Sequence, residues 1–452
     1  MRIPHIKCYM KKMNKKIILV SILLFLPFSL FSETIILKSG KKIEAEIIKK
    51  SNDYIKIDFH GVLLTYYLDD IVSIDEGYIK SDTLSSSHIS ATKMPYYNHI
   101  DEILNTPEKD IDLTKAVLLA YKTWDLSIDT TKYFNQIDSM TNDIKTKIDS
   151  ANISAPKDIA LFISRYLFQN LSLSPIIQDN MLRMSQIEHD TMGKTQFLTY
   201  LLDEKKGSCM NFSLLHLAIA ERLNFSLFLV SAPQHLFVRY DDGIEKFNIE
   251  TLLEAKIVDD SFYIEWKKIS SGIIKKGIYL RNLSKKETIG IVLEDLARFY
   301  SEINNDDMAI AIIDKSLQFY PNNIEALTKK GALYLRKYAH LAKQYDKFDS
   351  FLLESAIEFF QRSLEANPDY IDALINLGTA LMLKQKNDVA MEQFNKVLSI
   401  QPGYGPAYQR LAALHSLAER YDLAWEYAIK AKDSGWPIPN NTFEDIKKNR
   451  GK

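Results

Sequence analysis

The residues best suited to chemistry lie between positions 207 and 250. Cys209 follows a turn residue, Gly207, and a helix-capping residue type, Ser208, and it opens a stretch with apolar residues at helical spacing. A helix N-terminus favours negative charge, so this position would stabilise a thiolate at neutral pH. The only other cysteine is Cys8, close to the N-terminus. Cys209 is therefore expected to be either an inert buried thiol or a nucleophile.

Two predicted strands carry a histidine and two candidates to orient it. The first strand begins at His235, and Asp242-Gly243 predicts a two-residue hairpin turn before the return strand. This register places His235 opposite Glu250, with Asn248 diagonally across on the same face. Either polar residue could orient the imidazole.

A thiol at a helix start, a histidine on a nearby strand and a polar partner for that histidine form a constellation used in nucleophilic acyl transfer. The sequence around them resembles the transglutaminase-like superfamily in its compact bacterial branch, over about residues 110–260. The stretches that carry this resemblance are GSCMNFSLLHLA (207–218), APQHLFVRY (232–240) and FNIET (247–251).

The resemblance implies that Cys209 is the nucleophile and His235 the general base. The family usually has Asp-Pro where this chain has Glu250-Thr251. Glu250 fits the third role by position, and Asn248 fits it by side-chain type. The resemblance implies a papain-like α+β fold for this part of the chain.

Other residues in this region are given simpler interpretations. The backbone amide of Cys209 and a neighbouring donor would stabilise an oxyanion, because Gln196 is too remote in sequence to be assigned. His216 shares the helix face of Cys209 and is predicted to be core or pocket wall, and Trp266 to be core. No set of residues has metal-ligand spacing and no phosphate-binding loop occurs, so we expect no metal and no cofactor.

The N-terminus predicts an export signal. Residues 1–32 contain six basic residues and no acid, and the 15-residue apolar run Ile17–Phe31 precedes Ser32-Glu33. This run is shorter than the roughly 20 residues of a membrane-spanning helix, so no stable span is expected beyond the signal, although an uncleaved anchor is an alternative. The predicted location is the periplasm or cell envelope.

Composition limits the class of protein. The 452 residues are 46% hydrophobic and 25% charged, which predicts a folded multidomain chain. Beyond residue 32 the chain has 51 basic and 58 acidic residues, a net charge of −7. Without a basic stripe to neutralise phosphates, nucleic-acid binding is not expected.

Two flanking regions have patterns of their own. Alternating residues between 33 and 76 predict five short strands and resemble the SH3-like barrels of bacterial exported proteins, which suggests either a spacer or dimerisation module or a domain that contacts peptide or cell wall. The C-terminal third has a 34-residue period and resembles tetratricopeptide repeats, with a 13-residue insertion around 339–350. One copy has the signature residues Leu374, Leu377, Gly378, Leu381, Ala390, Phe394 and Pro402.

The small residues of the repeats, such as Gly378 and Ala390, predict close helix contacts. Such arrays present either a concave peptide-binding face or a rigid arm. The predicted organisation is a signal peptide (1–32), an SH3-like β-barrel (33–78), a linker (79–98), an α+β transglutaminase-like domain (99–280), an all-α solenoid of four repeats (288–438) and a polar tail (439–452).

Two functions follow from these patterns. The first is an exported, thiol-dependent acyl-transfer enzyme, either a peptidase or amidase or a transamidase, whose repeats recruit a peptide or protein substrate. The alternative is a non-catalytic envelope scaffold that binds peptides or proteins through the repeats and a relict cleft. Cys209→Ala separates them, because it abolishes function only in the first.

Overall fold

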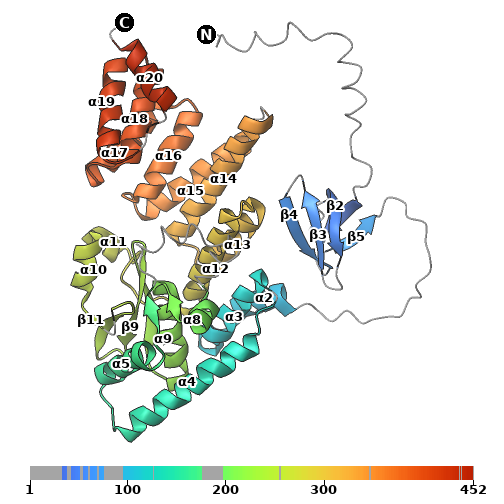
Figure 1. The fold of residues 1–452 in the computed structure, drawn as a ribbon, viewed down its shortest axis with the longest axis vertical. Helices are drawn as coiled ribbons and strands as arrows, with labels where there is room; N and C mark the ends of the chain where they lie inside the picture. Colours follow the sequence, from blue (N-terminus) through green and yellow to red (C-terminus); the bar gives the residue numbers. More distant parts are fainter. Residues whose placement is uncertain are drawn as a thin grey trace. The chain divides into compact units, whose positions relative to one another are not determined.

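The computed structural model forms two compact units, Met1–Pro95 and Tyr96–Lys452 (Figure 1). The predicted signal segment and most of the predicted linker lie outside the described residues. The described residues are 33–37, 42–50, 54–59, 62–68, 71–75, 95–125, 127–175, 197–253, 256–345, 348–436, 438 and 440–450.

The first unit contains a five-stranded antiparallel sheet in the order β4-β3-β2-β1-β5. Ile35 and Ile55 are fully buried, and partly buried apolar residues pack against them. The strands are β1 (Glu33–Leu37), β2 (Lys42–Lys50), β3 (Tyr54–Phe59), β4 (Val62–Tyr67) and β5 (Ile71–Asp75). All five predicted strands are present, and the closure of this sheet into an SH3-like barrel stays a prediction.

The second unit begins with helices whose apolar residues recur at helical spacing. Asp112 and Asp129 cap the N-termini of two of them by accepting backbone N–H groups of the first turn. The elements are α2 (Pro95–Asn105), η2 (Glu108–Asp110), α3 (Leu113–Trp124), α4 (Thr130–Ser150), α5 (Pro156–Arg165), η3 (Tyr166–Asn170), β6 (Ser174–Pro175), α8 (Leu198–Glu204) and β7 (Lys206–Gly207).

A central helix packs against a four-stranded antiparallel sheet (Figure 1). Helix α9 (Cys209–Leu223) is buried at every residue from Met210 to Ala220, so more than the one apolar face predicted for it is covered. It contacts β8 (Leu227–Ala232) and β9 (His235–Asp241), and the sheet continues through β10 (Lys246–Glu250) to β11 (Lys256–Val258). Helices α10 (Asp260–Lys267) and α11 (Ser271–Lys275) follow.

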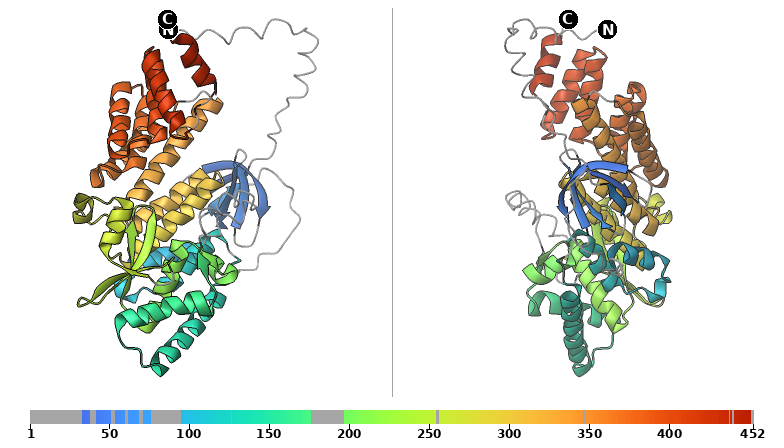
Figure 2. Two further views of the ribbon diagram at one scale, coloured as in Figure 1. Left: turned by 60° about the vertical axis from the view of Figure 1, so that its left-hand side comes forward. Right: turned by 90° about the vertical axis from the view of Figure 1, so that its right-hand side faces the viewer.

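The C-terminal third stacks consecutive helix pairs, as both views of Figure 2 show. The predicted insertion lengthens α14, which has 22 residues where the corresponding α16 has 13. The pairs are α12 (Lys285–Glu302) with α13 (Asp306–Phe319), α14 (Ile324–Tyr345) with α15 (Ser350–Ala366), α16 (Ile371–Leu383) with α17 (Asn387–Ile400), and α18 (Gly405–Leu417) with α19 (Tyr421–Asp433).

Small residues allow the paired helices to approach each other. A Cβ added at Gly378 would lie 2.5 Å from the Phe394 ring, and one added at Gly331 would lie 2.6 Å from the Phe360 ring. Both phenylalanines are fully buried. The close contacts predicted from the small residues of the repeats are therefore present.

The hydrophobic core continues across the predicted boundary at residues 280–288. One cluster of buried residues extends from Ile100 to Leu333, so α12 and α13 pack into the same core as α9. The predicted polar tail forms α20 (Asn440–Asn449), because its one fully buried apolar residue, Ile446, packs against the last repeat. None of the described helices is long and apolar enough to cross a membrane.

Candidate functional site

The N-terminus of α9 holds Cys209 in place. Ser208 is the N-cap, as predicted, and its backbone N–H and its hydroxyl both donate to Oδ1 of the buried Asn211, at 2.6 and 2.7 Å. Gly207 fits closely before the cap, because a Cβ there would lie 3.0 Å from both Asn211 and Leu201 and would push these side chains apart. Cys209 itself is only partly buried. The first turn is thus fixed while the thiol stays accessible.

The hairpin that carries the histidine has a different register from the predicted one. Lys246, not Ile244, pairs with Asp241, so four residues rather than two form the loop. The reason is the Asp242 side chain, whose Oδ1 accepts the backbone N–H groups of Ile244 and Glu245. A slip of two residues keeps every side chain on its face of the sheet. The register error therefore changes partners along the strand but not which face they share.

In this register Asn248 lies opposite Arg239, and Glu250 becomes the diagonal neighbour of His235. Nε2 of His235 lies 2.8 Å from Oε2 of Glu250. The two candidate orienting residues are thus separated. Glu250 contacts the histidine, whereas the prediction that Asn248 lies diagonally across from it is wrong.

The Glu250 carboxylate is buried, with 1% of the residue exposed, and has three hydrogen-bond partners. Besides His235, the Tyr263 hydroxyl donates to Oε2 at 2.9 Å and the Leu252 backbone N–H donates to Oε1 at 3.1 Å. Tyr263 is itself fixed by stacking on Phe237, with ring centroids 3.8 Å apart. This network fixes the orientation of the His235 ring.

The pKa of His235 reflects two polar neighbours, Cys209 and Glu250. Burial alone would lower the pKa of His235, but hydrogen bonds to the Cys209 sulfur and the Glu250 carboxylate, with the negative charge of both, raise it to about 9. Because Nε2 is engaged by Glu250, the nitrogen left for the sulfur is Nδ1. With a pKa of about 9, the ring is protonated at neutral pH.

Asn248 has a structural role in this arrangement. Its Oδ1 accepts from Nε of Arg239 at 2.6 Å, and its Nδ2 donates to Oδ1 of Asp260 at 2.8 Å. Arg239 is buried, with 1% exposed, and also donates to the Leu280 carbonyl at 2.9 Å. These bonds tie β9 and β10 to the start of α10 and to the segment before the repeats.

Two residues of α10 join the site and were missed. Trp266, predicted as core, is 52% exposed and lies edge-on to His235, with ring centroids 5.0 Å apart. Lys267 lies over the Trp266 ring, with Nζ 3.9 Å from its centroid. Burial lowers the pKa of Lys267, while the charges of Cys209 and Glu250 act in the opposite direction. The sequence signal for these two residues is their spacing of three and four residues from Tyr263, which places all three side chains on one face of the helix.

His216 is buried in the core, in agreement with its interpretation as core or pocket wall. Its Nδ1 lies 2.7 Å from the Phe212 carbonyl and its Nε2 lies 2.9 Å from the Ser164 hydroxyl. Burial lowers its pKa to about 4, so the ring is neutral and donates to the carbonyl. No metal-ligand cluster occurs among the described residues. Gln196 lies outside them.

Comparison with known proteins defines the class of two regions. Residues 131–265, which contain Cys209, His235 and Glu250, match the transglutaminase-like superfamily. Residues 348–424 match the tetratricopeptide repeat family. The chain thus contains a transglutaminase-like domain followed by tetratricopeptide repeats.

Individual known proteins match the chain at low sequence identity. The chain is 24% identical over 254 residues to a "UPF0162 protein" of Xylella fastidiosa, covering 54% of this chain and 83% of that relative. It is 27% identical over 221 residues to a "TPR repeat-containing protein" of Methanocaldococcus jannaschii, covering 45% of this chain and 37% of that one. A crystal structure of MamA is 25% identical, covering 32% of this chain and 78% of that one, with a TM-score of 0.28.

Proposed function

We propose that this protein is a thiol-dependent acyl-transfer enzyme that acts on a peptide or protein substrate. The observation that carries the proposal is the His235 imidazole, held 2.8 Å from the buried Glu250 carboxylate and with its pKa raised by Cys209 and Glu250 together. In such a site the thiolate attacks an amide carbonyl, and the imidazolium protonates the departing amine. Water or a second amine then releases the acyl group from the sulfur, which corresponds to an amidase or a transamidase.

The remaining parts of the chain support a protein or peptide substrate. Tetratricopeptide arrays form extended surfaces for protein and peptide partners, and here the first helix pair, α12 and α13, shares the core of the transglutaminase-like domain. We include in the proposal that the chain is exported to the periplasm or envelope by residues 1–32. An SH3-like barrel formed by residues 33–78 would serve as a spacer or as a contact to cell-wall polymer.

The first test is the rate at which iodoacetamide alkylates Cys209 in the folded protein as a function of pH. A thiolate paired with an imidazolium reacts rapidly well below the ordinary cysteine pKa of about 8.5. We expect this acid-shifted reactivity in the wild type and its loss in His235→Ala. His340→Ala, which removes an exposed histidine of α14, is the matched control.

A slow reaction that titrates near pH 8.5 and is unchanged in His235→Ala would reject the enzyme proposal. The alternative, a scaffold that binds peptides or proteins without turnover, would then account for the fold. With a reactive thiol, mass spectrometry of glutamine-containing peptides, with and without added amine, separates deamidation from amine incorporation.

A further inference from the structure

Helix α10 presents an aromatic surface, formed by Phe262 and Trp266, beside the reactive histidine. The Trp266 ring is edge-on to the His235 ring, with centroids 5.0 Å apart and planes inclined by 68°. The Phe262 ring, one turn earlier on α10, lies 5.8 Å from the Trp266 ring. His235 is 7% exposed, whereas Trp266 is 52% exposed and Phe262 is half-buried. A buried imidazole is thus bordered by an aromatic surface that a substrate can reach.

Trp266 is not held in its exposed position by a hydrogen bond. Among the described residues the indole N–H of Trp266 has no acceptor, whereas that of the exposed Trp436 donates to Oε1 of Gln409 at 3.2 Å. Leaving an indole in contact with water forgoes the free energy that its burial would release. A ligand that covered the ring would recover this free energy, which is why tryptophan often dominates binding surfaces.

The contact with His235 places the aromatic surface on the amine side of the reacting bond. In the proposed reaction the imidazolium protonates the departing amine, so the ring must lie within hydrogen-bond reach of that nitrogen. One residue of extended chain spans about 3.3–3.6 Å. A side chain that follows the reacting bond can therefore reach a ring whose centroid lies 5.0 Å from that of the imidazole.

A lysine lies over each ring of the aromatic surface. Nζ of Lys267 is 3.9 Å from the centroid of the Trp266 ring, and Nζ of Lys256 is 5.4 Å from that of the Phe262 ring. These two ammonium groups already use the attraction of the ring faces for cations. A further cation would be repelled by them, so the surface favours an apolar side chain over a basic one.

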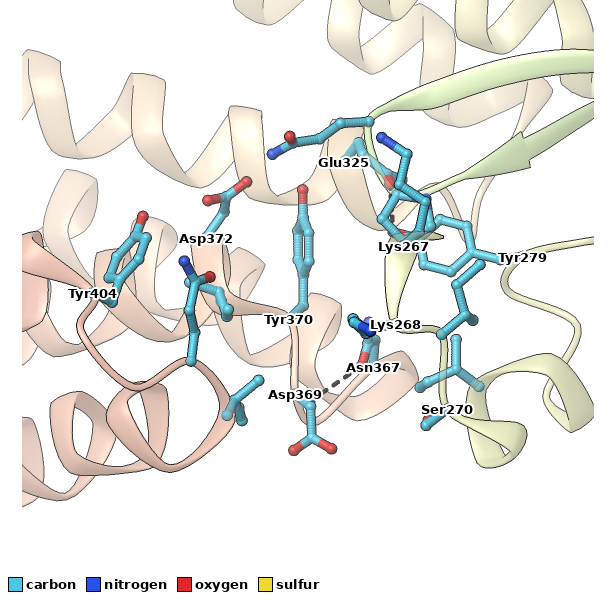
Figure 3. A pocket seen from close by; sticks show the side chains of 17 residues that line it. Lys267, Lys268, Ser270, Tyr279, Glu325, Asn367, Asp369, Tyr370, Asp372 and Tyr404 are labelled. Atoms are coloured by element: carbon cyan, nitrogen blue, oxygen red, sulfur yellow. Dashed lines mark hydrogen bonds between the residues drawn. The ribbon is translucent and has the colours of Figure 1, made fainter. Parts of the chain in front are cut away.

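The cavity between the transglutaminase-like domain and the repeats, both in the second unit, does not include this surface (Figure 3). It has a volume of about 520 Å³, and its lining carries both signs of charge, with Lys267 and Lys268 opposed by carboxyl groups such as that of Asp372. Neither Phe262 nor Trp266 lines it. Of the two features, only the aromatic surface has a ring in contact with His235 and a clear preference for one kind of side chain.

We propose that Phe262 and Trp266 form a substrate subsite that binds a large apolar side chain on the amine side of the reacting bond. This inference rests on the proposed function and adds its substrate class, a peptide in which an aromatic or large aliphatic residue, and not lysine or arginine, follows the reacting carbonyl. Covering the exposed rings provides the affinity, and Lys256 and Lys267 provide the discrimination.

The test uses three iodoacetamides that carry a 2-phenylethyl, a propyl or a 2-aminoethyl group on the amide nitrogen, which corresponds to the amine side of a substrate. In each reaction the Cys209 thiolate displaces iodide and forms a thioether, so mass spectrometry gives the rate constant for labelling. Each rate constant is divided by that of unsubstituted iodoacetamide, and the same ratio for glutathione corrects for intrinsic reactivity.

We expect the phenylethyl reagent to be favoured over the propyl reagent by at least about fivefold, the size of an aromatic contact. The aminoethyl reagent should be slower than the propyl reagent by about two- to fivefold, the size of a charge interaction at a partly exposed site.

Substitutions assign these preferences to named side chains. Trp266→Ala should remove most of the phenylethyl preference, and Trp266→Phe, which keeps a ring, should retain part of it. Lys267→Gln should relieve the aminoethyl penalty while the phenylethyl preference persists. Trp436→Ala removes another exposed tryptophan, beyond α19, so it is the matched control and should change none of the ratios.

The outcomes separate this inference from the proposed function. If the phenylethyl and propyl reagents have equal corrected rates, or if the preference survives in Trp266→Ala, the subsite is rejected while the reactive thiol stands. An aminoethyl reagent as fast as the propyl reagent would reject the exclusion of basic side chains. If iodoacetamide itself shows no acid-shifted reaction with the folded wild type, the proposed function is rejected instead.

Discussion

The interior around His235 and the interior of the repeats are packed in different ways, although both lie in the second unit. Around His235 the interior is polar, and the buried Glu250 carboxylate is held by a ring nitrogen, a hydroxyl and a backbone N–H. Between the repeat helices the interior is apolar, and the Phe394 ring fills the space left by the missing side chain of Gly378. The first region depends on complete hydrogen bonding, and the second depends on shape.

This difference predicts which property a substitution changes in each region. A buried polar group that loses its partner bears a desolvation cost, so changes near Glu250 should affect charge and reactivity. A repeat helix that loses an aromatic ring leaves a cavity, so changes near Phe394 should affect stability alone. The Phe360 and Phe394 contacts of the repeats and the Tyr263 and Phe237 rings of the catalytic network lie in different clusters of the interior.

The largest effect is expected from Glu250→Gln. This change removes the charge that helps to raise the pKa of His235 and presents an amide N–H₂ to groups that already donate. We expect acyl transfer to fall about 10²- to 10⁴-fold, the usual range for loss of acid–base catalysis, and the acid-shifted alkylation of Cys209 to disappear.

The matched control is Glu245→Gln on the same hairpin, where the partly exposed carboxylate pairs with Lys157 at 2.9 Å. It should leave both measurements unchanged. Equal losses in the two variants would contradict a specific role for Glu250.

Phe394→Ala should have the largest effect on stability. Removing a fully buried aromatic ring typically costs about 3–5 kcal/mol, and we expect a loss of this size in the free energy of unfolding of the repeats, measured by chemical denaturation with circular dichroism. Alkylation of Cys209 without denaturant should be unaffected. Phe351→Ala is the control, because this side chain is on α15 with the residue 70% exposed.

A third prediction concerns the pH dependence of stability. The pKa of His235 is raised from 6.5 to about 9 on folding, so its contribution is fully present below pH 6.5 and is lost as the pH rises through 9. The shift corresponds to about 3 kcal/mol. Comparing unfolding free energies of the wild type and His235→Gln across this range should reveal the difference.

The contribution of His216 to stability has the opposite pH dependence, and it changes below pH 6.5. Its pKa is lowered to about 4, so its contribution is present above pH 6.5 and is lost as the pH falls through 4. A wild-type curve parallel to that of His235→Gln between pH 6.5 and 9 would contradict the pairing of His235 with Cys209 and Glu250.

The smallest effect is expected from Gly378→Ala. The new methyl group would overlap the Phe394 ring, and such overpacking typically costs about 1–3 kcal/mol. Adding Phe394→Leu should recover part of that loss, which a thermal or denaturant titration of the double variant would measure. Gly272→Ala is the control, because a Cβ there meets no atom within 4 Å. Equal losses at Gly378 and Gly272 would contradict the steric explanation.

The sequence predicted the repeats in more detail than the catalytic hairpin. The 34-residue period, the small residues and the insertion in α14 all follow from short-range spacing, since each repeat contacts its neighbours in the chain. For the hairpin, the Asp-Gly dipeptide favoured a two-residue turn, but the Asp242 carboxylate holds a four-residue loop. Local turn chemistry thus moved Asn248 away from His235.

The residues missed at the site share a physical reason. Trp266 lies against His235, and Lys267 lies near enough to Cys209 and Glu250 for their charges to act on its pKa. Both positions follow from the packing of α10 against the sheet, which no local pattern specifies. Their helical spacing from Tyr263 indicates a common face but not what that face contacts. The prediction of Trp266 as core failed because an aromatic residue type does not distinguish a core from a half-exposed site wall.

By itself, the sequence determined the class of the two main regions and the unique thiol in the described part of the chain. It also determined that His235 and Glu250 share one face of the sheet, because residue types and strand alternation are local properties. Only the tertiary structure decided that Glu250 rather than Asn248 contacts the histidine. Arg239 and Asp260 occupy the hydrogen-bonding groups of Asn248. It also brought Gln234 and Lys267 together with Tyr370 and Asp372 around one cavity, since these residues come from segments that only the packing of the repeats against the sheet brings together.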